Sequence, residues 1–333
     1  MTPTMQALEI DSSRKKPILR LTERPRPEPS DSEILIRVEA AGVNRADLMQ
    51  KAGAYPPPRG VTDIPGLEAA GVVVAAGPRA ARFEAGDPVM ALLSGGGYAQ
   101  YAVVNERHAM AVPADMSMEE AAAVPEAYLT AFQALRQVGE IQRGERVLIH
   151  GGASGVGMAA IQIARVLFDA EVAVTVGKRA KLTFCREQGA ALAIHHRKQD
   201  FADVLQAKYG KHPVNLILDI VGSPYFEANL RSLATDGRLV MLSMLGGRGP
   251  VELDLAPLLR RRLTIRGTTL RNRPDAYKHR LVGDFLAYSD GAFNPLDGLW
   301  PTLDSIYPWD QAEKAHTRMD KNRNMGKIVL TGM

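Results

Sequence analysis

The chain has 333 residues, with 41 Lys and Arg against 37 Asp and Glu, a formal net charge of +4. With 46% hydrophobic and 23% charged residues, it has the composition of an ordinary globular protein, and its length favours two domains over one. The small basic excess suits an anionic ligand but argues against a nucleic-acid-binding face, which carries a larger clustered charge. We interpret the densest basic run, Arg260 to Arg262, as a solvated helix end.

The sequence also lacks the features of membrane, secreted and disulfide-bonded proteins. No apolar stretch reaches the length of a membrane helix, and the first residues, MTPTMQALEI, lack the basic and apolar regions of a signal peptide. We therefore expect a cytoplasmic protein without a membrane partner. The single cysteine, Cys185, allows no internal disulfide and no thiolate-rich zinc site, and its helical surroundings predict a buried apolar role.

The first third of the chain predicts β-structure with loops. Short β-prone runs bounded by Gly, Pro and Asp lie at residues 33–42, 71–77, 87–93 and 98–104. The segment PPPRGVTDIPG cannot be helical, because successive prolines remove backbone donors. The pattern changes near residue 117, where Ser117 is followed three residues later by Glu120, the signature of a capping box at the start of a helix-prone segment.

From there strands and helices alternate. Apolar strands are predicted at 145–150, 171–176, 191–195, 214–221, 237–243 and 262–270, and helices at 155–168, 178–189, near 199–209 and near 224–234. This pattern indicates an α/β fold with a parallel sheet covered on both faces, which suits a doubly wound Rossmann domain. The tail of about 60 residues holds one more helix and a closing strand, GKIVLT, and is too small to stand alone. We expect it to pack on the N-terminal β-rich part.

A glycine-rich stretch, HGGASGVG, lies between the first of these strands and the helix after it. Gly155-x-Gly157-x-x-Ala160 fits the dinucleotide fingerprint, in the strand–turn–helix context that gives the motif its meaning. Small residues let the backbone approach a pyrophosphate, and the amides at the helix N-terminus bind its charge. The second strand then ends VTVGKRAK, with no carboxylate to hold the ribose hydroxyls. The cations there favour a 2′-phosphate, so the sequence predicts NADPH rather than NADH.

Strings along nearly the whole chain resemble the zeta-crystallin-like, zinc-free NADPH:quinone oxidoreductase family of the medium-chain dehydrogenase/reductase superfamily. They are VNRADLMQKAGAYPPP (43–58), PGLEAAGVV (65–73), VPEAYLTAFQAL (124–135), VLIHGGASGVGMAAIQIA (147–164), VNLILDIVG (214–222) and NMGKIVL (324–330). Within the family, the chain is most similar to the tumour-suppressor-inducible quinone oxidoreductase subgroup.

The resemblance implies a division of the chain and a quaternary structure. A GroES-like catalytic domain would comprise residues 1–124 and 268–333, and a Rossmann NADPH-binding domain residues 125–267. A homodimer would form by edge pairing of two Rossmann sheets. Zinc-dependent relatives carry Gly-His-Glu where this chain has Gly66-Leu67-Glu68, so we expect no catalytic zinc.

The resemblance also assigns site residues. Asn44, which shares the string NRAD with Asp47, matches an asparagine near the nicotinamide, and Tyr55 matches a tyrosine at cofactor and substrate. Ser154 stands where many members have glycine, and its hydroxyl caps the helix, contacts a phosphate or reaches toward the substrate. The catalytic residues expected are thus Tyr55, Asn44 and Ser154. The expected cofactor contacts are Asn44, Tyr55 and Thr130 at the nicotinamide; Ala153, Ser154, Gly155, Val156 and Gly157 at the pyrophosphate; Gly177, Lys178, Arg179, Lys181 and His196 at the 2′-phosphate; and Ser243, Met244, Leu245, Gly246, Thr268, Thr269, Leu270 and Lys327 around the nicotinamide pocket.

The expected reaction is hydride transfer from NADPH to a quinone, with ortho-quinones as one candidate group. A quinone needs little acid or base catalysis, and Tyr55 is the local proton donor that we expect, unless it only packs on the substrate. Reduction of an enone, an alkenal or an enoyl thioester is the alternative on the same scaffold, and there the carbon must be protonated. A third alternative is a structural or RNA-binding crystallin-like role, which is supported only by the +4 net charge and by Arg260 to Arg262.

Overall fold

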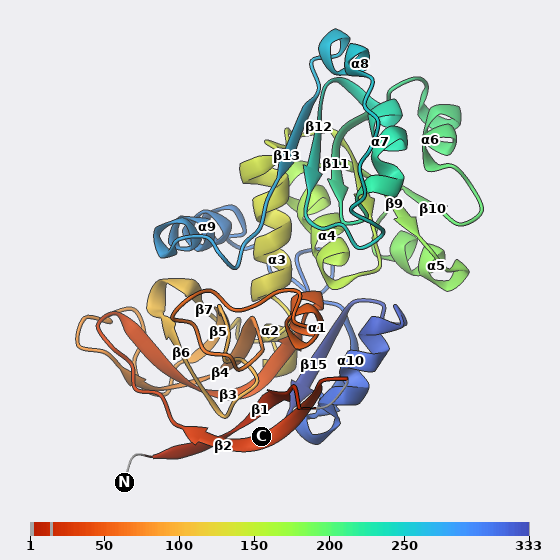
Figure 1. The fold of residues 1–333 in the computed structure, drawn as a ribbon. Helices are drawn as coiled ribbons and strands as arrows, with labels where there is room; N and C mark the ends of the chain where they lie inside the picture. The colour runs from red at the N-terminus through yellow and green to blue at the C-terminus, as the bar shows by residue number, and fades with distance from the viewer. Residues whose placement is uncertain (1–2, 14–15, 333) are drawn as a thin grey trace. The chain divides into compact units, whose positions relative to one another are not determined.

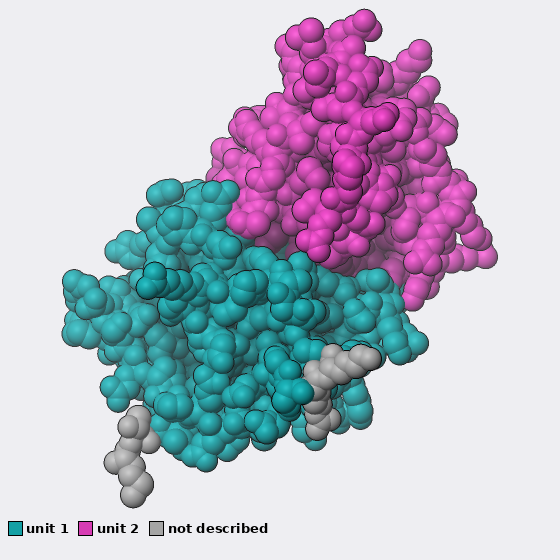
Figure 2. All heavy atoms as spheres, in the orientation of Figure 1, with its two compact units in different colours: residues 1–129, 270–287, 301–333 teal, residues 130–269, 288–300 magenta. Residues whose placement is uncertain are grey.

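The computed structural model describes residues 3–13 and 16–332 and divides into two compact units (Figure 2). Unit 1 comprises Met1–Leu129, Leu270–Ala287 and Pro301–Met333. Unit 2 comprises Thr130–Thr269 and Tyr288–Trp300. The chain therefore enters unit 2 after Leu129, returns to unit 1 for residues 270–287, contributes residues 288–300 to unit 2, and ends in unit 1.

Unit 1 is built on a mainly antiparallel sheet that combines strands from the first third of the chain with two strands near its C-terminus (Figure 1). Among the described residues its order is β14-β15-β3-β4-β5-β7, with β6 pairing β3. The closing strand expected for the tail is β15, and it pairs antiparallel with β3, Ile328 opposite Val43. These strands are β3 (Glu33–Val43), β4 (Glu68–Ala76), β5 (Pro88–Leu92), β6 (Tyr101–Asn105), β7 (Ala109–Ala111), β14 (Leu303–Pro308) and β15 (Lys327–Thr331).

A hairpin and several short helices complete unit 1. The hairpin strands β1 (Thr4–Asp11) and β2 (Ile18–Pro25) pair antiparallel. Their apolar side chains join one core with β3, β4, β6, β15 and the C-terminal helix α10. The helices are α1 (Arg45–Lys51), η1 (Glu106–His108), α2 (Met118–Ala121), most of α3 (Pro125–Phe132), most of α9 (Asp275–Tyr288), η4 (Trp309–Gln311) and α10 (Ala312–Asp320).

Unit 2 contains the predicted doubly wound sheet. Its described strands are all parallel and lie in the order β10-β9-β8-β11-β12-β13, which is 3-2-1-4-5-6 in chain order. The strands are β8 (Arg146–His150), β9 (Glu171–Val176), β10 (Leu192–His195), β11 (Val214–Asp219), β12 (Leu233–Met241) and β13 (Thr264–Gly267). Successive residues of β8 and β9 are buried, so both faces of the sheet are covered, as the continuous apolar runs predict.

The helices of unit 2 follow its strands. α4 (Gly155–Phe168) contacts β8 and β9, whereas α6 (Phe201–Tyr209) and α7 (Phe226–Ser232) share a core with strand residues such as Leu148 and Ile217. The remaining helices are η2 (Gln133–Val138, a π-helix), α5 (Arg179–Glu187), η3 (Ser223–Tyr225) and α8 (Leu255–Arg260). Cys185 is buried in α5, as predicted, and Arg260 is the last residue of α8.

The helix-prone segment after residue 117 is interrupted. Ser117 and Glu120 do form the predicted capping box, since Ser117 N donates to Glu120 Oε2 (3.0 Å) and Glu120 N donates to Ser117 Oγ (3.2 Å). The helix that they start, α2, ends at Ala121, and α3 begins at Pro125. The cause is Pro125, which has no backbone N–H to continue a helix but fits its first turn. None of the helices in the described residues combines the length and hydropathy that a membrane span needs.

Candidate functional site

The glycine-rich turn connects β8 to α4 in unit 2. Ser154 is the N-cap residue of α4, and its hydroxyl accepts a hydrogen bond from Gly157 N (3.1 Å). Of the roles considered for Ser154, helix capping is thus the one that the structure contains. A Cβ atom on Gly157 would lie 2.5 Å from the carbonyl oxygen of Gly151, so no side chain fits there. The amides of Gly155 and Val156, the first two residues of α4, precede its helical hydrogen-bond ladder and lie at a helix N-terminus, where an anion binds.

A buried network of polar side chains lies at the end of β8, directly before this turn. The ring of His150 contacts Thr175 Oγ1 through Nδ1 (2.9 Å) and Asn229 Oδ1 through Nε2 (2.7 Å). Asn229 Nδ2 donates in turn to Asp219 (3.2 Å), whose carboxylate accepts from the Val221 amide (2.6 Å). Burial lowers the pKa of His150 to about 4, so the ring is neutral at physiological pH. The network ties the ends of β8, β9 and β11 together.

Cations gather where β9 ends. Lys178 and Arg179 are exposed at the start of α5, and neither side chain forms an ion pair with a residue that the structure describes. The side chains of His196 and Arg197 lie close to Gly177. A Cβ atom added to Gly177 would be 3.0 Å from His196 Nε2 and 3.3 Å from Arg197 Nε. The structure therefore groups His196 with Gly177, and it adds Arg197. The sequence analysis missed Arg197, although the run HHRK directly after a strand was a signal for it.

The other predicted cofactor residues of unit 2 follow the carboxyl ends of later strands of the same sheet. The loop after β12 pairs with the loop after β11, since Leu245 N donates to Ile220 O (3.0 Å) and Gly246 N to Val221 O (2.9 Å). Thr268 follows β13 and donates to Met241 O (3.0 Å). Because the carboxyl ends of parallel strands share one edge, these loops lie along the edge that carries the glycine turn. All the predicted cofactor residues that follow a strand of this sheet therefore lie along one edge. They are Ala153 to Gly157, Gly177 to Arg179, Lys181, His196, Ser243 to Gly246, Thr268 and Thr269.

The residues of unit 2 fit a bound dinucleotide. The side-chain-free turn and the helix N-terminus after it have the features of a pyrophosphate site, and the exposed cations Lys178 and Arg179 lack a counter-charge among the described residues. The hydroxyl of Thr130, predicted at the nicotinamide, is buried and has no hydrogen-bond partner among the residues described. A buried hydroxyl without a partner is costly in a folded protein, and a ligand group would satisfy it.

Asn44, Tyr55, Leu270 and Lys327 belong to unit 1, where two of them meet. The Lys327 ammonium donates to Asn44 Oδ1 (2.8 Å) and forms a short ion pair with Glu68, while Asn44 Nδ2 donates to the Glu68 carboxylate (2.8 Å). The side chains of Lys327 and Glu68 are 5% and 0% exposed. Lys327 is thus held by acceptors of its own unit, an arrangement that the resemblance did not indicate.

Asp47 lies beside this group and is also satisfied. Its carboxylate accepts from Asn44 N (2.7 Å), Gly66 N (3.2 Å) and Tyr98 Oη (3.1 Å). Burial raises the pKa of Asp47 to about 6 even though these hydrogen bonds and Lys327 favour its charged form. Asp47 therefore fixes the start of α1, where Asn44 is the N-cap residue.

Tyr55 is held by a buried arginine that the sequence analysis did not select. Arg271 donates to the backbone oxygen of Tyr55 (3.3 Å), and its guanidinium lies 5.4 Å from the centre of the Tyr55 ring. Arg271 also donates to Gln50 Oε1 (2.8 Å) and Ser94 O (2.8 Å), which anchors it within the unit. Burial and the charge of Glu126 raise the pKa of the Tyr55 hydroxyl, and Arg271 opposes them. Tyr55 is therefore a weaker acid than an exposed tyrosine.

Glu126 is the second group near Tyr55 that the sequence analysis missed. Its backbone N–H donates to Glu68 Oε2 (2.8 Å), which ties the start of α3 to the Lys327–Glu68 pair. Burial, with the charges of Glu68 and Asp47, raises the pKa of the Glu126 carboxyl to about 8. Glu126 is therefore a second group near Tyr55 whose pKa lies close to neutral pH. An acidic residue in the first turn of a helix is common, so the sequence alone carried no signal.

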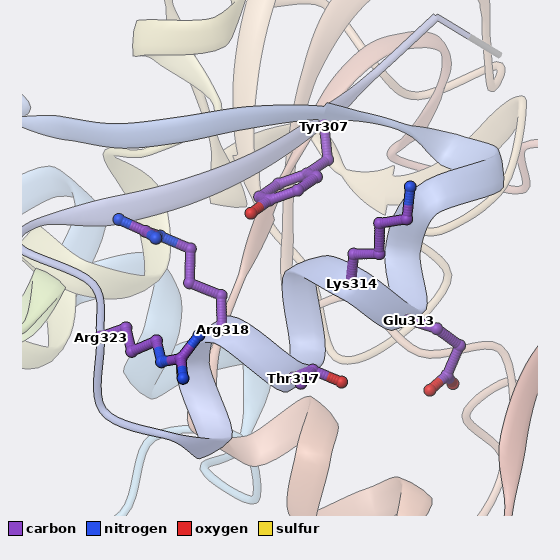
Figure 3. Close-up of a pocket in the computed structure, with 6 residues that line it drawn as sticks. All are labelled: Tyr307, Glu313, Lys314, Thr317, Arg318 and Arg323. Atoms are coloured by element: carbon purple, nitrogen blue, oxygen red, sulfur yellow. The ribbon is translucent and has the colours of Figure 1, made fainter.

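A pocket of unit 1 lies apart from the predicted site residues. No group of three or more His, Cys, Asp and Glu in residues 3–13 and 16–332 could hold a metal ion. A pocket of ≈ 310 Å³ lies at β14 and α10 of unit 1, and none of the predicted site residues lines it (Figure 3). Two of its charged side chains already have partners, Arg318 with Asp304 (2.5 Å) and Glu313 with Lys51 (2.9 Å). The described lining residues are Tyr307, Glu313, Lys314, Thr317, Arg318 and Arg323.

Comparison with known families covers both units. Residues 30–114 match the alcohol dehydrogenase GroES-like domain, and residues 155–284 match the zinc-binding dehydrogenase family. The quinone oxidoreductase of Sus scrofa is 29% identical over 91% of this chain and 90% of its own length. The human synaptic vesicle membrane protein VAT-1 homolog is 30% identical over 94% of this chain and 82% of its own length.

Solved structures share the whole fold. A mycobacterial protein complexed with NADPH has a TM-score of 0.84 and 28% identity, covering 98% of this chain and 100% of that one. The CurK enoyl reductase has a TM-score of 0.83 and 26% identity, covering 98% and 99%. The fold, the glycine turn and these matches together establish that the chain is a pyridine-nucleotide-dependent oxidoreductase of the medium-chain dehydrogenase/reductase superfamily, in the family of the quinone oxidoreductases.

Proposed function

We propose that this oxidoreductase uses NADPH to reduce quinones. The observation that carries the choice of NADPH is the exposed pair Lys178 and Arg179, which lies beside Gly177 with no carboxylate at the end of β9. The choice of quinones rests on the relatives, since the porcine and human proteins that this chain resembles are quinone oxidoreductases. When bound, the reduced nicotinamide supplies a hydride to the acceptor.

The residues have separate roles in this proposal. In unit 2, the glycine turn binds the pyrophosphate, Lys178, Arg179, Lys181, His196 and Arg197 bind the 2′-phosphate, and Thr130 contacts the nicotinamide. In unit 1, Asn44 orients the nicotinamide and Tyr55 packs against the acceptor. Lys327 keeps Asn44 and Glu68 in place. We propose that residues 1–124 and 268–333 form the catalytic domain and residues 125–267 the cofactor domain, with residues 125–129, which lie in unit 1, also near the acceptor.

A second candidate reaction is the reduction of an activated carbon–carbon double bond. The structural likeness to an enoyl reductase favours it, as do the acidic groups near Tyr55. In this reaction the carbon next to the carbonyl must be protonated, so the loss of a proton donor slows turnover strongly. Quinone reduction depends less on a donor, because water can protonate the product.

The test is oxidation of NADPH by purified protein, followed by nicotinamide absorbance, with phenanthrenequinone, an α,β-unsaturated aldehyde and crotonyl-CoA as separate acceptors. Each assay is repeated with NADH. The proposal expects turnover with the quinone, and a kcat/KM for NADPH that exceeds that for NADH. Turnover with the aldehyde or the thioester alone would favour the second candidate. A preference for NADH would refute the role given to Lys178 and Arg179.

We also propose that the protein is a homodimer formed through unit 2. β13 ends the order of described strands, and an unpaired strand edge is a template for pairing with a second chain. Leu255 and Leu259 of the neighbouring helix α8 are 62% and 81% exposed. Light scattering of the wild-type protein and of Leu259→Arg tests the proposal, which predicts a dimer that the substitution weakens.

A further inference from the structure

We propose that Glu126 is the proton donor to the acceptor, in the reaction given under Proposed function, on which this inference rests. Glu126 lies in the first turn of α3, and its backbone amide is fixed by Glu68. Its carboxyl forms no hydrogen bond or ion pair with any residue in the part of the chain that the structure describes. By contrast, the Glu68 carboxylate accepts from Lys327, Asn44 and Glu126 N, and the Asp47 carboxylate accepts three hydrogen bonds.

Because its carboxyl has no partner among the described residues, Glu126 can donate a proton to a ligand, whereas Glu68 and Asp47 cannot. Glu68 and Asp47 are fully occupied in holding unit 1 together, so their carboxylates are unavailable to a substrate. A half-buried carboxyl without a protein partner is costly to keep ionised, but it can give its proton to a ligand. Glu126 also lies near enough to Tyr55, the residue proposed to contact the acceptor, for its charge to raise the pKa of the tyrosine.

The charged neighbours of Glu126 decide its protonation state. Burial is the largest influence and raises its pKa, Glu68 and Asp47 raise it further, and Lys327 and Lys278 lower it. The balance leaves a pKa of about 8, so the carboxyl is mostly protonated at pH 7. The Tyr55 hydroxyl is also protonated there, but its raised pKa makes it the weaker acid of the two. The groups that face Glu126 from the elements around it are Glu68 of β4, Lys327 of β15, Asp47 of α1, Lys278 of α9, Tyr55 and Arg271.

The step balances as follows. The quinone gains a hydride, which is one proton and two electrons, from the reduced cofactor, and becomes a hydroquinone monoanion. The O–H bond of the Glu126 carboxyl breaks, and a new O–H bond forms on the product oxyanion. Glu126 is left as a carboxylate and recovers its proton from water before the next turnover. With an unsaturated carbonyl acceptor, the same carboxyl proton goes to the carbon next to the carbonyl group.

The first experiment measures the proton itself, without cofactor. Protein labelled with ¹³C at the glutamate carboxyl carbons is titrated by NMR, as wild type and as Glu126→Gln. We expect one resonance to titrate with a midpoint near 8 and to be missing from the variant, as the pKa raised to about 8 requires. A Glu126 resonance that titrates in the ordinary range of glutamate would overturn the inference, whatever the enzyme reduces.

The second experiment measures kcat against pH with a para-benzoquinone and NADPH. The wild-type rate should fall above about pH 8, as Glu126 ionises. We expect Glu126→Gln to lose about 10²-fold in kcat, within the range for general acids, and to lose this dependence. Glu126→Asp retains an acid and should recover part of the rate together with a basic limb. The control, Glu119→Gln, alters a carboxyl of α2 whose residue is half-exposed, and should match the wild type.

The outcomes separate the two proposals. A wild-type protein that reduces no quinone would refute the proposed function, and the role of Glu126 with it. If the wild type turns over and a folded Glu126→Gln keeps both its rate and its pH profile, only the role of Glu126 is refuted. Near-ultraviolet circular dichroism in a Trp300→Phe background, which leaves Trp309 packed 5.9 Å from the Tyr98 ring as the one tryptophan, shows whether unit 1 of each variant is folded.

Discussion

Breaking the Lys327–Glu68 ion pair should destabilise unit 1 by far more than an exposed ion pair would. The two side chains are 5% and 0% exposed, so removing either one leaves a buried charge without its counter-charge. We expect Lys327→Met and Glu68→Gln each to lower the free energy of unfolding of unit 1 by about 3–5 kcal/mol. The double variant buries neither charge, so it should lose about 2–3 kcal/mol less than the sum of the single losses.

Urea unfolding followed by tryptophan fluorescence measures these free energies. The chain has two tryptophans, Trp300 in unit 2 and Trp309 in unit 1, so a Trp300→Phe background restricts the signal to unit 1. Arg79→Met is the matched control, because the Arg79–Asp31 pair (2.7 Å) is 69% and 67% exposed and should contribute less than about 1 kcal/mol. Single losses no larger than that of the control, or losses that simply add in the double variant, would refute the reasoning.

Three further predictions concern unit 2. Lys178→Ala and Arg179→Ala should each raise the KM for NADPH about tenfold or more and leave the KM for NADH unchanged, because each charge-assisted bond to a phosphate contributes about 1.5–3 kcal/mol; equal changes for both cofactors would contradict this. Ser154→Ala should lower the stability of unit 2 by about 1 kcal/mol in urea unfolding, and Ser154→Gly by only a few tenths, as for other N-caps. The pKa of His150 is about 4 in the folded protein and about 6.5 when unfolded, so the unfolded state binds more protons below pH 6.5. Between pH 7 and pH 5 the wild type should therefore lose about 2 kcal/mol more than His150→Gln, and equal losses would show that His150 is not the group responsible.

The fold of unit 2 could be predicted closely because its strands are apolar on both faces and its helices are amphipathic. The helix predicted at 155–168 and the strand predicted at 171–176 have those bounds in the structure. In unit 1 the strands β1, β2, β7 and β14 were not predicted. β1 mixes buried and partly buried residues without a regular alternation, and β2 and β14 are mostly partly buried or exposed and end at prolines, so the pattern of each is weak until its pairing partner is known. β14 also pairs parallel with β15, and helix α10 connects the two strands in the chain. No local sequence pattern predicts such a long-range pairing.

The candidate site also has a part that the sequence predicts and a part that it does not. The glycine turn and the cations after β9 are contiguous in the sequence, so spacing alone predicts them. Arg271 and Glu126 acquire their character only when the fold buries them near Tyr55, which lies more than 70 residues away from either one in the chain. Neither belongs to a motif with a chemical meaning of its own. A pKa change of several units depends on burial and on neighbours from other elements, which a single sequence does not reveal.

The Lys327–Glu68 pair connects the stability of unit 1 to its proposed chemistry. Glu68 holds the backbone amide of Glu126, and Lys327 neutralises Glu68, so this pair sets both the position and the charge surroundings of the Glu126 carboxyl. Without the lysine, Glu68 would raise the pKa of Glu126 further, and the acid would give up its proton less readily. Replacing the whole pair by apolar residues of similar size could preserve stability, but it would remove the acceptor that fixes the Glu126 amide. In the proposed chemistry the buried pair therefore has a positioning role that an apolar core could not fill, because Glu68 accepts the hydrogen bond that fixes the Glu126 amide.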